Sequence, residues 1–267
     1  MITITSESSP KTNEPTVHSD PGLHLPRILC LHGGGTNARI FRAQCRSLSL
    51  RLEGRFRLIF ADAPFLSGPG PDVESVYAEW GPFRSWVRPT AGGAMSVTWA
   101  PGSVDVEAVD TAISNAVLAD DKFGATGSIV GLLGFSQGAR MAACLLLRRQ
   151  QENARRNRPN NHTITNTEYR FAVLLAGRGP LVALDNARKD VVDGVPPSLQ
   201  LRLPTIHVHG TRDPGLAIHR ELLHRDCVRD TARVIEWDGG HRVPIKTKDV
   251  APVVDAILQT ARETGII

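Results

Sequence analysis

The chain has 267 residues, of which 41% are hydrophobic and 22% are charged, and its formal net charge is +4. A chain of this length can fold as one large α/β domain, and it contains no apolar run long enough to cross a bilayer. The modest positive charge fits arginines scattered over a solvated surface. Binding of nucleic acid would require a clustered basic face with interleaved aromatic side chains, and the sequence shows no convincing one.

The cysteines are far apart and match neither a disulfide framework nor a metal-binding spacing. They are Cys30, Cys45, Cys144 and Cys227. The first 20 residues lack the charged and then apolar order of a signal peptide and the arginine content of a transit peptide. We therefore expect a reducing, cytoplasmic location, and we expect neither a metal nor a cofactor.

In chain order, a polar, proline-containing flexible tail is expected over residues 1–24, followed by a single domain over 25–267. Short apolar runs typical of strands cover 27–31, 56–60, 128–133, 171–175, 205–208 and 233–237. Helical periodicity covers 41–52, 104–118 and 139–147. The Gly- and Pro-rich segment 65–102 is expected to be irregular and lid-like, the polar segment 148–168 a helix end plus an exposed loop, and 178–203 a second irregular excursion.

Strands that alternate with helical segments predict an α/β fold, with a compact and mostly parallel sheet that carries helices on both faces. The sequence Gly134-Phe135-Ser136-Gln137-Gly138 stands between a buried strand and a buried helix. A serine at the apex of a strand–turn–helix unit is the nucleophile elbow of an α/β-hydrolase. The two glycines leave room where side chains would strike the neighbouring strand and helix. This context favours an α/β-hydrolase fold.

A serine hydroxyl needs a base, and the base needs an acid that fixes its tautomer. Ser136, Asp213 and His241 follow the chain order nucleophile, acid, histidine, and each comes directly after a predicted strand. Asp238 is the rival acid, but it lies close to His241 in sequence. Asp62 also ends a strand, but it precedes the serine and so breaks the order.

The tetrahedral intermediate of acyl transfer needs two hydrogen-bond donors aimed at its oxyanion. The backbone N–H of Gln137, which follows the serine, is one candidate. The second is Gly34, within the glycine-rich sequence that begins at His32 after the first strand. Such a sequence could instead cradle a phosphate, but it lacks both the Lys-Ser/Thr ending and the G-x-G-x-x-G spacing.

Two further sets of residues leave alternatives open. Trp80, Phe83 and Trp86 are candidates to line an acyl pocket beneath a lid, and packing within the core of their own segment is the alternative. His207 and His209 face the same side of a strand, where packing is favoured over metal binding because no third ligand stands at a suitable spacing.

The chain resembles the FSH-type serine hydrolases, a compact fungal branch of the α/β-hydrolases. The matching stretches are Ile28-Leu29-Cys30-Leu31-His32-Gly33, Ala61-Asp62-Ala63-Pro64-Phe65, Trp80-Gly81-Pro82-Phe83-Arg84-Ser85-Trp86, Gly134-Phe135-Ser136-Gln137-Gly138, Pro204-Thr205-Ile206-His207-Val208-His209-Gly210 with Asp213, and Gly239-Gly240-His241. They occur in the family's order and span nearly the whole folded part.

The resemblance implies a serine hydrolase that forms an acyl-enzyme. Some members of the family resemble esterases of small substrates, and others resemble trans-acting thioesterases that release an acyl chain from the carrier domain of a polyketide synthase. The stretch from Trp80 to Trp86 is more similar to the second group. Rival functions are a stand-alone carboxylesterase for small lipophilic esters and a non-catalytic binding protein. The arginines after residue 148 are either a solvated surface or a docking patch for an acidic carrier domain.

Overall fold

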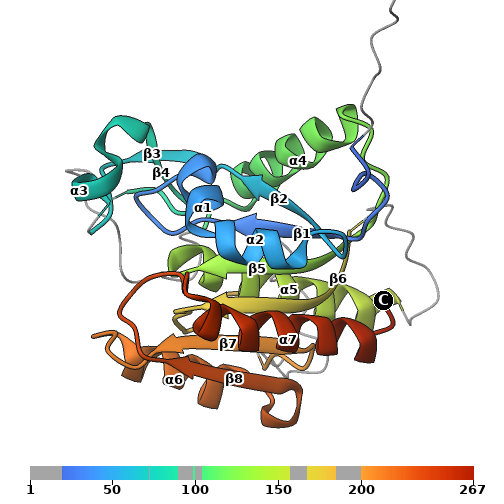
Figure 1. Ribbon diagram of the computed structural model, residues 1–267. Coiled ribbons are helices and arrows are strands. Elements are labelled where there is room, and N and C mark those ends of the chain that lie inside the picture. Colours follow the sequence, from blue (N-terminus) through green and yellow to red (C-terminus); the bar gives the residue numbers. More distant parts are fainter. Residues whose placement is uncertain (1–19, 72, 90–98, 100–103, 157–166, 185–199) are drawn as a thin grey trace, which may run out of the picture.

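A six-stranded sheet forms the centre of the protein (Figure 1). The computed structural model describes residues 20–71, 73–89, 99, 104–156, 167–184 and 200–267. The strand order is β2-β1-β5-β6-β7-β8, and every neighbouring pair is parallel. The strands are β1 (Arg27–Leu31), β2 (Arg57–Ala61), β5 (Ile129–Phe135), β6 (Thr167–Leu175), β7 (Thr205–Gly210) and β8 (Ala232–Trp237).

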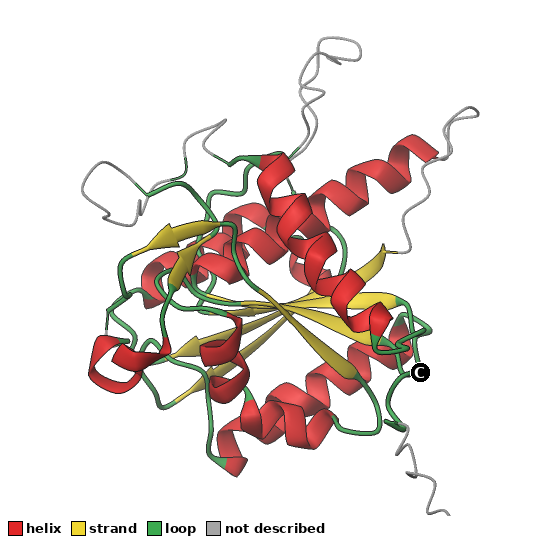
Figure 2. Cartoon of the chain, turned by 90° about the horizontal axis from the view of Figure 1, so that it is seen from above, coloured by secondary structure: helices red, strands yellow, loops and turns green. Residues whose placement is uncertain are grey.

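Helices cover both faces of this sheet, as the view from above shows (Figure 2). They are α1 (Ala38–Gln44), α2 (Arg46–Leu52), α4 (Val106–Lys122), α5 (Gln137–Arg156), α6 (Leu216–Asp226) and α7 (Thr247–Glu263). Strand β1 contributes to the core on both faces of the sheet, because successive side chains of a strand point to opposite faces. Leu29 and Leu31 join a cluster with residues of α4 and α5, whereas Ile28 and Cys30 join a cluster with residues of α1, α2 and α7.

These elements confirm the α/β-hydrolase fold and contain each of the predicted strand runs, with small shifts at their ends. The predicted helix over 41–52 is two helices that meet at Cys45. Helices α6 and α7 were not predicted, although α7 carries an apolar stripe that includes Val250, Val253 and Ile257. The helix expected over 104–118 extends to Lys122.

The segment expected to be irregular, 65–102, contains regular structure in its first part. Strands β3 (Phe65–Ser67) and β4 (Phe83–Ser85) pair antiparallel. Between them lie the short helix α3 (Glu74–Tyr77) and the 3₁₀ turn η1 (Ala78–Trp80). Residues 90–98 and 100–103 lie outside the described residues, so a lid role of the whole segment stays a prediction.

The start of the domain and the remaining irregular segments are only partly described. Residues 1–19 of the expected tail lie outside the described residues, but 20–24 form a turn in which Asp20 binds Arg57 and the Leu23 carbonyl accepts the Thr126 N–H. Residues 157–166 and 185–199 also lie outside them. Within the described part of the chain, no helix is both long and apolar enough to span a bilayer.

The parallel arrangement gathers distant loops at one edge of the sheet. The carboxyl ends of β1, β5, β7 and β8 all face this edge, since parallel strands point the same way. The loops that follow these strands begin at His32, Ser136, Thr211 and Asp238. The residues selected from the sequence as a site therefore come from strand ends at the same edge of the sheet.

Candidate active site

Ser136 occupies a strained turn between β5 and α5. Its φ angle is 53°, in the left-handed region that residues other than glycine rarely adopt. A Cβ atom at Gly134 would collide with the backbone of Gly138, and one at Gly138 would collide with the backbone at the end of β1. The elbow thus holds together only because both positions lack a side chain, and it presents Ser136 at the edge of the sheet.

The three residues selected for a triad form a continuous hydrogen-bonded chain. The Nε2 atom of His241 lies 3.0 Å from the Oγ atom of Ser136. The Nδ1 atom of the same ring lies 2.7 Å from Oδ2 of Asp213. Since an ionised carboxylate accepts the Nδ1 proton, Nε2 is left free to accept a proton from the serine hydroxyl. The rival Asp238 is exposed and pairs with Arg212 instead.

Asp213 is held by several donors at once. Its side chain is almost fully buried, which by itself raises the pKa of the carboxyl group. The Gly215 N–H and the histidine contacts together lower it by more, so the pKa lies below its ordinary value. The Gly215 amide donates to Oδ1 at 2.7 Å. Asp213 is therefore ionised and fixed in orientation at neutral pH.

A second histidine, His219, also contacts this carboxylate. Its Nε2 atom lies 3.0 Å from Oδ2 of Asp213, and its ring stacks near that of His241 with centroids 5.8 Å apart. His219 is not among the residues selected from the sequence, and it lies inside α6, a helix that was not predicted. No local pattern in the sequence points to His219, because its contacts with Asp213 and Gly177 arise only from the fold.

The two candidate oxyanion donors are Gly34, in the loop after β1, and Gln137, the first residue of α5. Neither the Gly34 N–H nor the Gln137 N–H has an acceptor among the described residues, so both are free to bind an oxyanion. The Gln137 side chain makes a different contact: its Oε1 accepts the backbone N–H of Trp86 at 2.7 Å. This bond ties the elbow to the residue that follows β4.

His32 and Trp86 form the support of the glycine-rich loop. The Nε2 atom of His32 accepts the Ala63 N–H, so the ring proton lies on Nδ1, next to the Gly33 carbonyl oxygen at 2.7 Å. Burial lowers the pKa of His32 to about 4, which keeps the ring neutral. The Trp86 indole N–H donates to the His32 carbonyl oxygen at 2.8 Å.

The aromatic candidates for substrate contact occupy different environments. Trp86 is fully buried, whereas Trp80 and Phe83 are partly exposed. The guanidinium of Arg39 lies 4.1 Å from the centre of a Trp80 ring. Trp86 packs in the core cluster, and substrate contact by Trp80, Phe83 and Trp86 stays a prediction.

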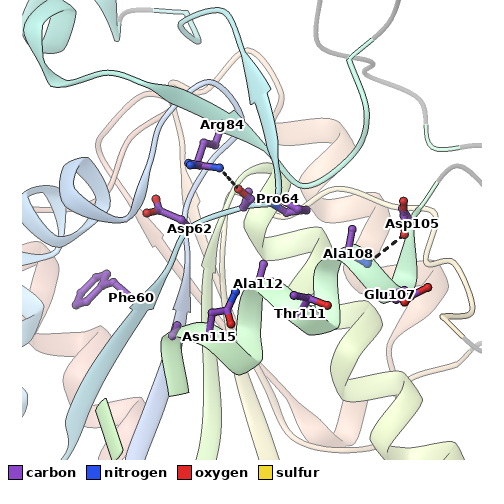
Figure 3. A pocket seen from close by; sticks show the side chains of 12 residues that line it. Phe60, Asp62, Pro64, Arg84, Asp105, Glu107, Ala108, Thr111, Ala112 and Asn115 are labelled. Carbon is purple, nitrogen blue, oxygen red and sulfur yellow. Dashed lines mark hydrogen bonds between the residues drawn. The ribbon is translucent and has the colours of Figure 1, made fainter. Parts of the chain in front are cut away.

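A cavity of about 720 Å³ opens between the end of β2, β4 and the first turns of α4 (Figure 3). Its lining includes Asp62 and Arg84 on one side and Asp105 and Thr111 on the other. None of Ser136, His241, Trp80, Phe83 and Trp86 is part of its lining. This cavity is thus separate from the serine.

Among the described residues, one group of acidic, histidine or cysteine side chains is compact enough to hold a metal ion, namely Asp213, His219 and His241. Its ligand atoms are the ones already joined by hydrogen bonds. His207 and His209 are fully buried with ring centroids 5.9 Å apart, and burial lowers their pKa values to about 3 and about 4. Their packing in the interior agrees with the favoured expectation.

A family model described as serine hydrolase (FSH1) matches residues 23–253. The chain belongs to the FSH1 serine hydrolase family. This FSH1 serine hydrolase is 54% identical to "Esterase pigG" of Monascus ruber, with 93% of this chain and 96% of that protein covered. It is 52% identical to "Probable esterase afoC" of Emericella nidulans, with 87% and 89% covered.

Solved structures share the fold at low sequence identity. The carboxylesterase from Mesorhizobium loti matches with a TM-score of 0.50 at 18% identity, over 87% of this chain and 88% of that one. The acyl-protein thioesterase 2 of Zea mays matches with a TM-score of 0.50 at 18% identity, over 90% of this chain and 95% of that one. These likenesses agree with the α/β-hydrolase fold of the FSH1 serine hydrolase.

Proposed function

We propose that this serine hydrolase cleaves an acyl ester or thioester through an acyl-enzyme on Ser136. His241 takes the hydroxyl proton on Nε2 while Oγ attacks the carbonyl carbon, and Asp213 stabilises the resulting imidazolium. The Gly34 and Gln137 N–H groups bind the oxyanion of the tetrahedral intermediate. His241 then returns the proton to the leaving thiol or alcohol, and a water molecule, activated by the same ring, releases the carboxylic acid.

One observation supports this mechanism above the others, namely the unbroken series of short contacts from Ser136 through His241 to Asp213. The test is labelling with a fluorophosphonate probe, which modifies an activated serine. We expect the wild-type protein to be labelled, and the Ser136→Ala and His241→Ala variants to lose labelling almost completely, since members of a triad act as a unit. Labelling of the His241→Ala variant at nearly the wild-type rate would exclude His241 as the base.

We further propose that the acyl donor is a thioester on a carrier protein, and that the released product is a polyketide or related acyl chain. The proposal is supported by the similarity of the stretch from Trp80 to Trp86 to carrier-acting thioesterases. The second candidate is a stand-alone carboxylesterase, which the names of the relatives as esterases favour. Both substrates react through the same tetrahedral route, so the triad alone does not distinguish them.

The substrate class can be tested with a matched series of acyl chains. Each chain is presented as a p-nitrophenyl ester, as an N-acetylcysteamine thioester and as a thioester on a phosphopantetheinyl carrier domain. We expect kcat/KM to be highest for the carrier-bound form, because a specific carrier adds binding energy that the short thioester lacks. Higher turnover of the aryl esters at every chain length would establish the carboxylesterase instead.

The arginines after residue 148 give only limited support to a docking patch. Arg148 pairs with Asp110, and Arg149 lies 3.8 Å from Glu152; both arginine side chains are largely buried. These two cations are therefore not free to attract an acidic carrier domain. The remaining members, Arg155, Arg156 and Arg158, lie outside the described side chains, so we assign no docking role to this segment.

For the location, we propose the cytoplasm. All four cysteines are free and buried, which is the usual state of thiols in a reducing compartment. Fluorescence microscopy of a tagged chain in a fungal cell is the direct test, and an extracellular or organellar signal would contradict this location.

A further inference from the structure

His219 lies directly behind the candidate triad and has no part in the mechanism described above. It is the fourth residue of α6 and is fully buried. Its Nε2 atom lies 3.0 Å from Oδ2 of Asp213, and its Nδ1 atom lies 3.0 Å from the carbonyl oxygen of Gly177. Oδ2 of Asp213 thus faces two imidazole rings, those of His219 and His241.

The identity of these partners determines where the ring protons of His219 lie. An ionised carboxylate and a carbonyl oxygen can only accept hydrogen bonds, so both contacts are satisfied together only by an imidazolium. Burial lowers the pKa of His219, while Asp213 and then the Gly177 carbonyl act against that shift. In the neutral ring, the single proton favours Nε2, because a carboxylate is a stronger acceptor than a carbonyl. In both charge states, Nε2 of His219 donates to Asp213.

The surroundings of the His219 ring leave it little freedom. The ring of His241 lies on one side at 5.8 Å between centroids, and the ring of His209 lies at 6.0 Å. A Cβ atom added at Gly215 would lie 3.0 Å from two atoms of the His219 ring. The titratable groups that face His219 are Asp213 from the turn before α6, His241 from the loop after β8, and His209 from β7. Its orientation is therefore fixed by close packing as well as by two hydrogen bonds.

We propose that His219 is a positioning residue of the reaction, which holds Oδ2 of Asp213 at the correct place and moderates the charge that Asp213 presents to His241. This inference rests on the proposed role of the triad. Within the described part of the chain, the contacts of the His219 ring are with Asp213, Gly177, His209 and His241, and none is with Ser136, Gly34 or Gln137. It acts through Asp213, which must accept the Nδ1 proton of His241 for the base to face Ser136 in the productive tautomer.

Two isosteric amides separate the contacts of the ring. In His219→Gln the side-chain amide nitrogen takes the place of Nε2 and can still donate to Asp213, whereas in His219→Asn it takes the place of Nδ1 and can donate only to Gly177. We expect kcat with p-nitrophenyl butyrate to fall about 10- to 100-fold in His219→Asn, because a hydrogen bond to a charged group is lost. His219→Gln is expected to retain most of kcat, with KM unchanged in both variants.

The pH dependence provides a readout that a purely structural role would not change. Without the His219 donor, the full charge of Asp213 acts on His241 and favours its protonated form. The acidic limb of the kcat/KM profile, which reports protonation of the free base, is therefore expected to move to higher pH in His219→Asn and to stay in place in His219→Gln. The matched control is His224→Asn, on the exposed side of the same helix, which should leave both kcat and the position of the acidic limb unchanged.

The outcomes separate this inference from the proposed function. If the wild-type protein does not react with a fluorophosphonate probe, the proposed function itself fails. If the wild-type protein reacts, but the asparagine and glutamine variants lose activity equally with an unmoved acidic limb, His219 serves only to stabilise the fold. Thermal unfolding of both variants shows whether each is folded at the assay temperature. Wild-type kcat and pH profile in a folded His219→Asn protein would overturn the inference outright.

Discussion

At the scale of single residues, Asp213 and Asp238 were the two acids that the sequence offered as a partner for His241. The chain order nucleophile, acid, histidine favours Asp213, and the closeness of Asp238 to His241 in sequence makes the required side-chain geometry harder to reach. The structure places Oδ2 of Asp213 2.7 Å from His241 Nδ1, whereas Asp238 is exposed and binds Arg212. The choice between the two carboxylates can therefore be tested directly.

The test compares Asp213→Asn with Asp238→Asn. An asparagine at 213 can donate to Nδ1 of His241, which places the ring proton on Nε2. That atom can then no longer accept the hydroxyl proton of Ser136. We expect kcat for an aryl ester to fall about ten-thousandfold, the size known for this change in serine proteases. The Asp238→Asn variant should keep its rate within a factor of two or so, because an exposed ion pair contributes little.

A large loss of activity in Asp238→Asn, with Asp213→Asn close to the wild-type rate, would reverse this assignment.

His219, the other side chain in contact with Asp213, could not be predicted from the sequence. A histidine inside a helix carries no local signal, and its significance arises only from the fold, which brings Asp213 and Gly177 to its two ring nitrogens. The placement of site residues at strand ends could be predicted from the sequence, whereas the contacts that a side chain makes from within a helix could not.

At the scale of elements, the nucleophile elbow depends on the close approach of α5 to β1. Gly138 faces the backbone at the end of β1, with no space for a Cβ atom. We expect Gly138→Ala to lower the free energy of unfolding by about 3 kcal/mol or to prevent folding, because an added methyl group must displace backbone. Denaturation in urea measures this change. The matched control is Gly68→Ala, where a Cβ atom would meet nothing within 4 Å.

Equal stability of the Gly138→Ala and Gly68→Ala proteins would show that the elbow is less tightly packed than this geometry requires. The elbow was the element that the sequence predicted best. Few other local structures fit a serine that has glycines on both sides and stands between two apolar runs. The break at Cys45 between α1 and α2 was not predictable, because the apolar spacing continues through it from Phe41 to Leu52.

Trp86, directly after β4, connects that small hairpin to the glycine-rich loop and to the elbow. Its indole N–H binds the His32 carbonyl oxygen, and its backbone N–H binds Gln137. We expect Trp86→Phe to lower the free energy of unfolding by about 1–3 kcal/mol, since a buried carbonyl loses its donor. Trp80→Phe, at a partly exposed position, should cost less than about 1 kcal/mol. Chemical denaturation of both variants decides the comparison, and equal losses would contradict it.

At the scale of the whole molecule, the sheet order was not available from the sequence, although its parallel character was. Strand periodicity and helical crossovers predict a parallel sheet, but no local pattern states that β1 lies between β2 and β5. Several histidines are buried in the folded protein, among them His32, His207 and His209. Their burial has a consequence for the stability of the entire fold.

Burial lowers the pKa of His207 to about 3 and those of His32 and His209 to about 4, from an ordinary value of 6.5. Between these values, the unfolded chain binds protons that the folded chain does not, so acid favours unfolding. The free energy of unfolding is therefore expected to fall as the pH drops from about 6.5 to about 4, by about 1.4 kcal/mol per pH unit for each imidazole.

Substitution of one of these histidines tests this origin of the acid sensitivity. In His207→Gln, a group that cannot be protonated replaces an imidazole, so the slope of the unfolding free energy against pH should decrease by about one proton between pH 6 and pH 4. His224→Gln, at an exposed position on α6, should leave the slope unchanged. Urea denaturation at a series of pH values gives both slopes. If the His207→Gln slope equals that of the wild-type protein, His207 binds the same number of protons in the folded and unfolded states, and its burial is not a source of the acid sensitivity.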